Sequence, residues 1–308
     1  MGKSKDIHTN HNELRKEILQ CLGPKIRKRM EELDVTLSVL SKITGIGIST
    51  ISDYISGRYE PSLSKTISLS KALEVDYGFF FDKEFLLCGR VIADGLVSYW
   101  TFDKDNIKNG IVKDLWEHND GKIMGSSRVV KGRFGEAIKF DGSSSFIQFD
   151  DSKMPSENEP RTISAWINLE EAPLTYNFGS IVEWGTNEKS QRCGILITAY
   201  QRVYFVGEFT DMPSDGTIEI GSWNNVAITY NGSMMKIYIN GKLDKEGSPG
   251  WGGKAIKLDT KLDKGRIGQN IRDNEPFPGI IDEIAIYKRE LSEDEIKKNY
   301  SFQNKPTS

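Results

Sequence analysis

Residues 48–53 carry side chains suited to reading another molecule by hydrogen bonds and apolar contact. Ile48, Ser49, Ser52 and Asp53 follow a spacing that puts them on one side of a helix, and Ile51 marks the opposite, buried side. Serine hydroxyls donate and accept hydrogen bonds, a carboxylate accepts them, and isoleucine offers methyl groups. This mixture matches the chemistry of the DNA major groove, which presents donors, acceptors and thymine methyl groups.

Two short helices joined by glycines must position these side chains. Thr36 is a suitable N-cap for the first helix because its hydroxyl accepts a hydrogen bond from a free backbone N–H. Leu40 and Ile43 give that helix an apolar side. Gly45 ends it, since glycine adopts a left-handed conformation without steric cost, and Gly47 can cap the next helix. Two helices crossing over such a turn form a helix-turn-helix, which presents its second helix to the major groove.

The segment resembles the lambda-repressor/Cro-like, or XRE-type, helix-turn-helix family over about residues 24–82. The family often has a phosphate-bracing glutamine where this chain has Leu37, and a base-reading amide is common where it has Asp53. The resemblance implies a domain of five helices. It rests on the order and spacing of Ile26, Met30, Leu40, Ser41, Gly45, Ile46, Ile51, Ser52, Gly57, Pro61, Leu63, Ile67, Ser70, Leu73 and Val75.

The resemblance and the helix geometry together assign roles to the exposed side chains. Of the four residues expected to face bases, Ile48 can contact a thymine methyl group, and Ser49 and Ser52 can reach a base edge or a phosphate. Asp53 can accept a hydrogen bond from cytosine N4. One such domain covers only a half-site, so double-stranded DNA and a homodimer are the expected partners. The expected phosphate contacts are Lys42, Ser56, Arg58 and Tyr59.

The whole chain has the composition of a soluble globular protein of about two domains. Its 308 residues are 37% hydrophobic and 28% charged, with a net charge of −3. A net negative charge does not attract nucleic acid, so DNA binding must depend on local clusters of basic residues. Cys21, Cys88 and Cys193 are odd in number, far apart and without metal spacing. With a polar N-terminus and no apolar run of about 18 residues, the chain is expected to be cytoplasmic, with reduced thiols and no membrane partner.

From Leu96 onward, helical spacing gives way to short alternating runs between clusters of Gly, Asn and Asp. About a dozen such runs, with Thr217–Ile220 among them, continue to Tyr287 and predict an all-β sandwich of two sheets. Ser292–Tyr300 predicts a short closing helix in which Ser292 and Glu295 form a capping box.

These strands resemble the LamG-like jelly roll of the concanavalin A-like lectin/glucanase superfamily. The resemblance follows the family's order over nearly all of residues 96–300. Trp100, Trp166 and Trp223 each lie in an alternating strand and are expected in the core. The matching segments are Leu-Val-Ser-Tyr-Trp-Thr-Phe-Asp (96–103), Gly-Arg-Phe-Gly-Glu-Ala-Ile-Lys-Phe-Asp-Gly (132–142), Thr-Ile-Ser-Ala-Trp-Ile (162–167), Trp-Asn-Asn-Val-Ala-Ile-Thr-Tyr (223–230), Ile-Tyr-Ile-Asn-Gly (237–241) and Gly-Ile-Ile-Asp-Glu-Ile-Ala-Ile-Tyr (279–287).

Such sandwiches include lectins, adhesion modules and hydrolases, so the fold does not decide the activity. An enzyme of this superfamily needs paired carboxylates, and the chain lacks the strand motif Glu-x-Asp-x-x-Glu; neither Asp282-Glu283 nor the segment Glu208 to Asp211 supplies the spacing. We therefore expect a binding module that is not an enzyme, with carbohydrate or a protein as ligand. Trp251, in a glycine-rich loop, is a candidate platform for a sugar, and it can equally plug the edge of the sandwich.

No cofactor is required by this sequence, although the fold often carries one structural calcium ion. Calcium prefers several oxygen ligands. Asp103 follows the first strand and Asp282 lies on the last, and these are the aspartates of paired terminal strands in the family. A calcium ion shared by the two is therefore one expectation, and two turn-forming aspartates are the alternative.

The expected fold class is multi-domain, with an all-α five-helix helix-turn-helix domain followed by an all-β two-sheet jelly-roll sandwich. The expected function is a sequence-specific transcriptional regulator whose sandwich binds a ligand or partner. One alternative is an interaction or oligomerisation protein that does not bind DNA, and a remote one is a glycan-active enzyme. The expected boundaries are 1–23 for a tail and extra helix, 24–82 for the DNA-binding domain, 83–95 for a linker, 96–300 for the sandwich and 301–308 for a tail.

Overall fold

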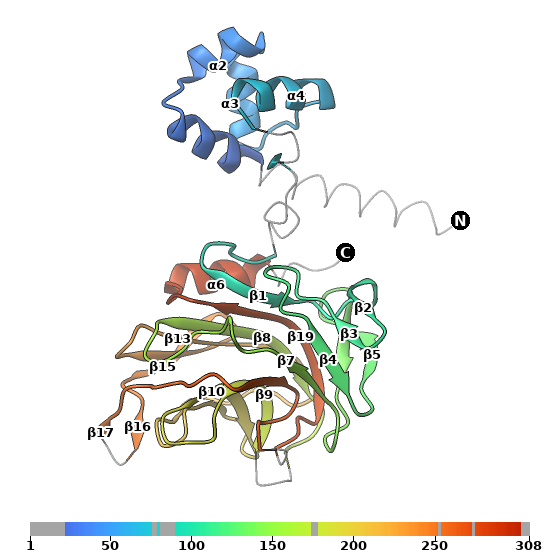
Figure 1. The fold of residues 1–308 in the computed structure, drawn as a ribbon, viewed down its shortest axis with the longest axis vertical. Helices are drawn as coiled ribbons and strands as arrows, with labels where there is room; N and C mark the ends of the chain where they lie inside the picture. Colours follow the sequence, from blue (N-terminus) through green and yellow to red (C-terminus); the bar gives the residue numbers. More distant parts are fainter. Residues whose placement is uncertain are drawn as a thin grey trace. The chain divides into compact units, whose positions relative to one another are not determined.

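The computed structural model describes residues 22–75, 79–80, 90–173, 178–251, 254–272 and 275–302. The chain divides into two compact units, a helical one that extends to Ala93 and a β-rich one that begins at Asp94 (Figure 1). The predicted fold class is confirmed, because helices are followed by two antiparallel sheets that form a sandwich.

The helical unit is built from local signals that the sequence carries. Thr36 caps α2 by accepting a hydrogen bond from the N–H of Val39. Gly45 ends α2 with a φ of 70°, and Gly47 is the N-cap of α3. These three predictions are confirmed, and so is the helix-turn-helix. The described helices are residues 22–32, α2 (Leu37–Thr44), α3 (Ile48–Ile55) and α4 (Leu63–Ala72), followed by a single 3₁₀ turn at 79–80.

The core of this unit is small. Ile51 is fully buried in it, together with Leu40. The prediction that Ile43 also faces this core is wrong, since its side chain is 59% exposed. The buried side of α2 is set by Leu40 with the partly buried Leu37 three residues before it, which leaves Ile43 on the other side. Ile67 of α4, one of the residues that carry the family resemblance, is also on the surface, at 38% exposed.

Two large antiparallel sheets form the second unit, and we name them sheet A and sheet B. Sheet A has the order β15-β14-β13-β8-β19-β6-β5, with β1 paired to β19; sheet B has the order β12-β11-β10-β9-β18-β7-β4-β3-β2. A separate hairpin joins β16 (Gly250–Trp251) and β17 (Lys254–Ala255). The strands of sheet A are β1 (Leu96–Trp100), β5 (Arg128–Lys131), β6 (Glu136–Lys139), β8 (Arg161–Leu169), β13 (Trp223–Tyr230), β14 (Met235–Ile239), β15 (Lys242–Gly247) and β19 (Gly279–Tyr287). Those of sheet B are β2 (Ile107–Lys108), β3 (Ile111–Val112), β4 (Gly121–Met124), β7 (Phe146–Phe149), β9 (Phe178–Gly185), β10 (Arg192–Thr198), β11 (Val203–Val206), β12 (Met212–Pro213) and β18 (Lys264–Ile267).

The apolar faces of both sheets contribute to one core, which includes Trp100 and Trp184. Two details differ from the sequence-based expectation. The strand predicted at Thr217–Ile220 is absent, since residues 217–219 form no strand. Ile218 is buried there, and its N–H donates to the carbonyl of Gln201. This one inward side chain accounts for the alternating pattern in the sequence. Trp223 at the start of β13 is half-buried and not a core residue.

Helix α6 (Glu293–Phe302) packs against the outer face of sheet A, where the side-chain amide of Asn299 donates to the hydroxyl of Tyr287 in β19 at 3.1 Å. The predicted capping box is confirmed, since Ser292 and Glu295 each donate a backbone N–H to the other's side chain. Tyr300 of α6 stacks on Trp166 of β8 with ring centroids 5.6 Å apart. Trp166 is buried as predicted, but against α6, because its neighbours Ala165 and Ile167 are the ones that enter the core between the sheets.

Buried carboxylates hold several loops of the sandwich. Asp282 is fully buried, and its Oδ2 accepts hydrogen bonds from the N–H groups of Arg133 (2.9 Å) and Phe134 (3.1 Å) at the tip of the β5–β6 hairpin. Asp114 and Asp151, each 2% exposed, hold other loops in the same way. Burial raises the pKa of all three carboxyls, and that of Asp282 well above its usual range.

Replacing Ile51 by alanine is expected to unfold the helical unit at lower denaturant concentration. The substitution leaves a cavity in a small core, which costs roughly 2–5 kcal/mol. Ile48→Ala on the same helix is the matched control, since that side chain is 49% exposed. Denaturant unfolding of the full chain, followed by circular dichroism at 222 nm, measures both. Equal losses for the two variants would contradict the assignment of the buried face.

The sandwich is expected to lose stability as pH rises above about 4, the unfolded pKa of a carboxyl. A carboxyl whose pKa is raised by folding binds more protons in the folded state, so its contribution is complete below the unfolded pKa and is lost as pH rises through the folded one. Asp282→Asn should flatten the dependence of melting temperature on pH between 4 and 8, because asparagine keeps an acceptor and cannot ionise. Asp105→Asn, at an exposed position, is the control, and EDTA keeps cations out. An unchanged profile for Asp282→Asn would refute this account.

Candidate functional site

Helix α3 presents three of the four predicted base-facing side chains to the surface. Ile48 is 49% exposed, and Ser49 and Ser52 are also exposed. Ile51 and Tyr54 are buried on the opposite side. The exposed row therefore combines one apolar and two hydroxyl groups at spacings of one and three residues, which is a surface that can contact base edges.

The predicted phosphate contacts are all on the surface, close to the ends of the two motif helices. Lys42 lies in the last turn of α2, and Ser56 is the C-cap of α3. Arg58 and Tyr59 follow the turn at Gly57, where φ is 69°. All four side chains are exposed to solvent.

Asp53, the fourth predicted base-facing residue, differs from the other three because it forms an ion pair within the unit. Its Oδ1 accepts a hydrogen bond of 2.6 Å from Nη1 of Arg58. The N–H of Arg58 also donates to the carbonyl of Asp53 at 2.8 Å. In the free protein, a base acceptor and a phosphate donor of the predicted interface are thus occupied by each other.

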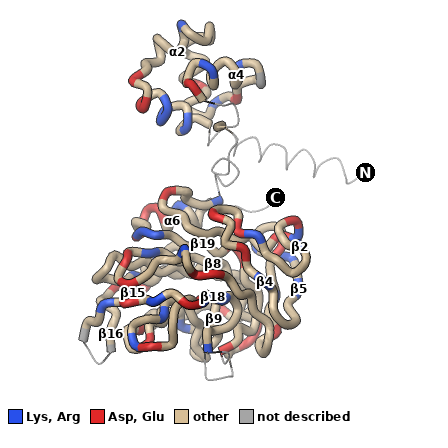
Figure 2. The backbone as a smooth tube through the Cα atoms, viewed as in Figure 1, with Lys and Arg blue, Asp and Glu red and all other residues tan. Residues whose placement is uncertain are grey.

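Two of the basic residues on helix 22–32 are engaged inside the helical unit. Nζ of Lys25 donates to the carbonyl of Phe79 at 3.1 Å. Arg29 donates to the carbonyl of Leu73 and pairs with Glu32. Figure 2 shows Lys and Arg interspersed with Asp and Glu along the backbone of both units.

Asp103 and Asp282 lie near one another, as the calcium expectation requires. After burial and a hydrogen bond from Phe134, the charge of Asp103 is the next largest influence on the pKa of Asp282, and it raises that pKa. Among the described residues, no side chain or backbone group is found as a hydrogen-bond partner for the buried Oδ1 of Asp282, which would suit a cation. Calcium, however, takes about six to eight oxygens, and within the described ranges no three His, Cys, Asp or Glu side chains group as a metal site.

The alternative role of these two aspartates has direct support. Oδ1 of Asp103 accepts the N–H of Glu136 at 3.0 Å, and Asp282 accepts two N–H groups from the same hairpin tip. The two carboxylates thus position the tip of the β5–β6 hairpin. Trp251, the candidate sugar platform, has its backbone in the β16–β17 hairpin, and its side chain lies outside the described residues.

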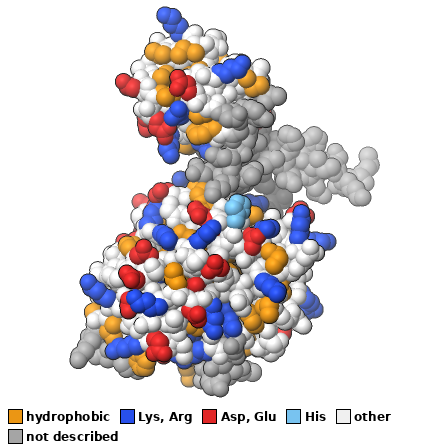
Figure 3. All heavy atoms as spheres, in the orientation of Figure 1, with side chains coloured by type: hydrophobic (Ala, Val, Ile, Leu, Met, Phe, Trp, Pro, Cys, Tyr) orange, Lys and Arg blue, Asp and Glu red, His pale blue; other side chains and the backbone are white. Residues whose placement is uncertain are grey.

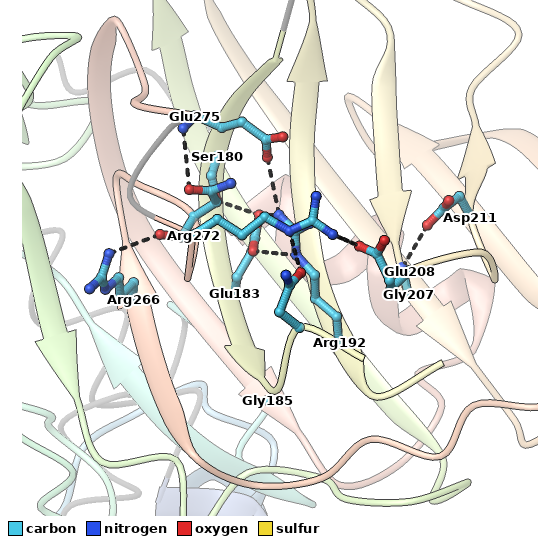
Figure 4. Close-up of polar contacts among 12 residues, drawn as sticks. Ser180, Glu183, Gly185, Arg192, Gly207, Glu208, Asp211, Arg266, Arg272 and Glu275 are labelled. Carbon is cyan, nitrogen blue, oxygen red and sulfur yellow. Dashed lines mark hydrogen bonds and ion pairs between the residues drawn. The ribbon is translucent and has the colours of Figure 1, made fainter. Parts of the chain in front are cut away.

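A cluster of charged side chains on the outer face of sheet B was missed by sequence reasoning (Figure 4). At its centre is Arg192 of β10, only 2% exposed. Arg192 binds Glu183 of β9 through two hydrogen bonds, Nε to Oε2 at 2.8 Å and Nη2 to Oε1 at 2.9 Å. It also reaches Glu275 at 3.1 Å and Glu208 at 3.4 Å. Arg272 pairs with Glu208 from the other side.

The electrostatics of this cluster follow from burial and from the excess of carboxylates. Burial alone would lower the pKa of Arg192, but the charges of Glu183 and Glu275 and their hydrogen bonds outweigh it and raise the pKa. Burial raises the pKa of Glu275, and the negative charge of Glu183 raises it further. The positive charge of Arg192 lowers this pKa, but by less than the other two effects raise it. Removing one partner of a charge pair this deeply buried strongly destabilises the folded protein, because the other charge is left unpaired. The cluster therefore fixes the loops that supply its members.

The loop that carries Glu208 is strained. Glu208 and Phe209 both have positive φ, 56° and 66°, a conformation that residues with a Cβ adopt at a cost. Thr210 Oγ1 donates to the carbonyl of Gly207 at 2.7 Å, and Asp211 Oδ1 accepts the N–H of Gly207 at 2.9 Å. The strained turn holds Glu208 toward Arg192 and leaves Phe209 50% exposed.

Two family models match the sequence. A model described as the concanavalin A-like lectin/glucanases superfamily matches residues 141–297, and a model described as helix-turn-helix matches residues 26–80. Comparison with curated protein sequences gave no match.

Several solved structures share the fold of the sandwich. Domain 4 of AbnA, an extracellular GH43 arabinanase of Geobacillus stearothermophilus solved with arabinotriose, has 20% identity and a TM-score of 0.52, over 67% of this chain and 98% of that one. The binding domain of Paraclostridial Mosquitocidal Protein 1 has 19% identity and a TM-score of 0.52, over 67% of this chain and 52% of that one. Trypanosoma rangeli sialidase, solved as a covalent intermediate with 2,3-difluorosialic acid, has 16% identity and a TM-score of 0.52, over 70% of this chain and 34% of that one. This chain thus spans about half of the second protein and a third of the third, and likeness at such identities is one of fold.

None of the described helices has the length and apolar character that crossing a bilayer requires. The described helices and sheets agree with both matching models in kind and in order along the chain. The chain therefore belongs to the concanavalin A-like lectin/glucanases superfamily through its sandwich, which is fused to an N-terminal XRE-type helix-turn-helix domain.

Proposed function

We propose that this protein is a sequence-specific DNA-binding regulator of transcription whose sandwich binds a carbohydrate ligand. The observation that carries the proposal is the exposed row Ile48, Ser49 and Ser52 on α3, with Lys42 and Arg58 exposed near the ends of the motif helices. The helix-turn-helix match supports DNA as the partner. A single domain of this kind covers one half-site, so we propose a homodimer on a palindromic operator in the cytoplasm.

We propose that the sandwich binds its ligand without chemical change and needs no cofactor for it. The superfamily match and the arabinanase domain solved with arabinotriose favour a saccharide. The three glutamates that come together, Glu183, Glu208 and Glu275, all contact the guanidinium of Arg192. Carboxylates engaged in this way are occupied by the arginine, whereas a glycosidase needs two that are open to substrate.

A second candidate function has its own supporting observation. Val39 is 45% exposed and Ile43 is 59% exposed, and they lie one helical turn apart on α2. An apolar pair in this position, with Asp53 paired to Arg58, favours a helical unit that docks a protein and does not bind DNA. The two candidates differ in whether the full chain selects a DNA sequence.

Selection from a random double-stranded DNA library with the full chain is expected to enrich a short palindrome. Binding should weaken steeply between about 50 and 200 mM salt, because phosphate contacts release counterions. Ser49→Glu should abolish enrichment, since it places a negative charge at the base-facing surface. Ser64→Glu, at an exposed position on α4, is the control and should leave selection intact. No enrichment, or enrichment insensitive to Ser49→Glu, would favour the docking function.

Asp53→Asn is expected to tighten DNA binding several-fold at low salt. The substitution removes a negative charge next to the phosphates and releases Arg58, so the slope of log affinity against log salt should steepen by about one. Arg58→Ala should weaken binding and make the slope shallower by a similar amount. Fluorescence anisotropy with the selected operator measures both. Glu31→Gln removes the same charge from an exposed position on helix 22–32 and should have a smaller effect; if it matches Asp53→Asn, the ion pair does not restrain binding.

A further inference from the structure

A hollow of about 480 Å³ opens on the outer face of sheet B, where β4, β7 and β18 run side by side. This volume lies within the range of small-molecule sites in proteins. Figure 3 shows basic and acidic side chains intermixed on the visible face of the molecule. The hollow is lined by Asp120, Lys122, Met124, Gln148, Phe149, Asp150, Asp263 and Lys264, and it shares no residue with the Arg192 cluster.

Three of the lining side chains stand on one face of adjacent strands. Lys122 of β4 is paired in register with Gln148 of β7, and Gln148 is paired with Arg266 of β18. Lys264 lies two residues before Arg266, so it projects from the same face. In the described part of the chain, the side chains of Lys122, Gln148 and Lys264 make no hydrogen bond or ion pair. Their donors and one amide oxygen are therefore available on rigid strands, which position groups more accurately than loops do.

The walls of the hollow supply acceptors that are already fixed in place. Oδ1 of Asp120 accepts the N–H of Asp114 at 3.1 Å, and Oδ1 of Asp150 accepts the N–H of Ser152 at 2.9 Å. A carboxylate has about four lone-pair sites, so each keeps capacity for a ligand. Asp263 at the rim is exposed, and none of the described residues bonds its carboxylate.

This donor set points to an uncharged, hydroxyl-rich ligand. Two ammonium groups face three carboxylates, one of which also pairs with Lys113, so the charges nearly balance and no strong field favours a polyanion. The ammonium groups donate hydrogen bonds, the carboxylates accept them, and the amide does both, so a ligand here needs groups that both accept and donate. Every sugar hydroxyl does so. Met124, two residues from Lys122 on β4 and only half-buried, adds apolar surface for the C–H face of a sugar ring.

We propose that this hollow is the saccharide site of the sandwich and that it takes a neutral oligosaccharide of two or three residues. Lys122, Gln148 and Lys264 donate to its hydroxyl groups, and Asp150 and Asp263 accept from them. The proposal rests on the function proposed above for the sandwich and is independent of the function proposed for the helical unit.

Titration calorimetry of the full chain with arabinotriose, xylotriose, cellotriose and maltotriose tests the proposal, with trigalacturonate as the charged counterpart. At least one neutral trisaccharide is expected to bind. Gln148→Trp, at an exposed position, fills the hollow and should abolish that binding. Lys122→Ala combined with Lys264→Ala removes donors and should weaken binding at least about tenfold. Lys242→Ala, an exposed lysine of β15 in sheet A, is the control and should bind as the parent does.

Binding of a neutral trisaccharide that survives both Gln148→Trp and the double lysine variant would overturn the hollow as the site and leave the sandwich a saccharide-binding module. Binding of trigalacturonate alone, or of none of the five sugars, would overturn the ligand class. Operator selection is measured separately on the same protein, so neither result is confounded with failure of DNA binding.

Discussion

The sandwich depends on one strand, β19, near the end of the chain. It hydrogen-bonds to β8 and β6 and also to β1, the first strand of the unit. Sheet A is therefore incomplete until β19, its last strand, has been synthesised. The pairing of β19 with β1 brings together residues from opposite ends of the unit. Contacts of such long sequence separation form slowly. The helical unit has its own core of nearby residues and does not wait for this event.

The sequence predicts best those features that depend on neighbouring residues. The cap at Thr36, the left-handed turn at Gly45 and the capping box of Ser292 are all decided within four residues, and all three were predicted. Which side of a helix is buried depends on distant segments. Ile43 was assigned to the core by its spacing from Leu40, whereas the packing of α2 selects the side that carries Leu37.

The charged cluster on sheet B could not be assembled from the sequence because its members are dispersed. Glu183 and Arg192 lie on neighbouring strands, while Glu208 and Glu275 come from separate loops. A weak signal was present: Glu183 stands between Val182 and Trp184 in an apolar run, and a charge in such a run needs a buried partner. The hollow could not be predicted from the sequence for the same reason. Only the register between β4, β7 and β18 brings Lys122, Gln148 and Lys264 together.

The ion pair of Asp53 and Arg58 has a consequence for the chemistry of recognition. In the proposed complex with DNA, a phosphate that reaches Arg58 displaces the carboxylate of Asp53 as well as water, so association at this point is an ion exchange in which the protein supplies the outgoing anion. The affinity for DNA then reflects the difference between two binding free energies at the guanidinium of Arg58, that of the phosphate and that of the Asp53 carboxylate. Such a site is sensitive to which anion the buffer contains as well as to how much, and an oxyanion such as sulfate competes at Arg58 more effectively than chloride does, because only the oxyanion can match the planar fork of donors.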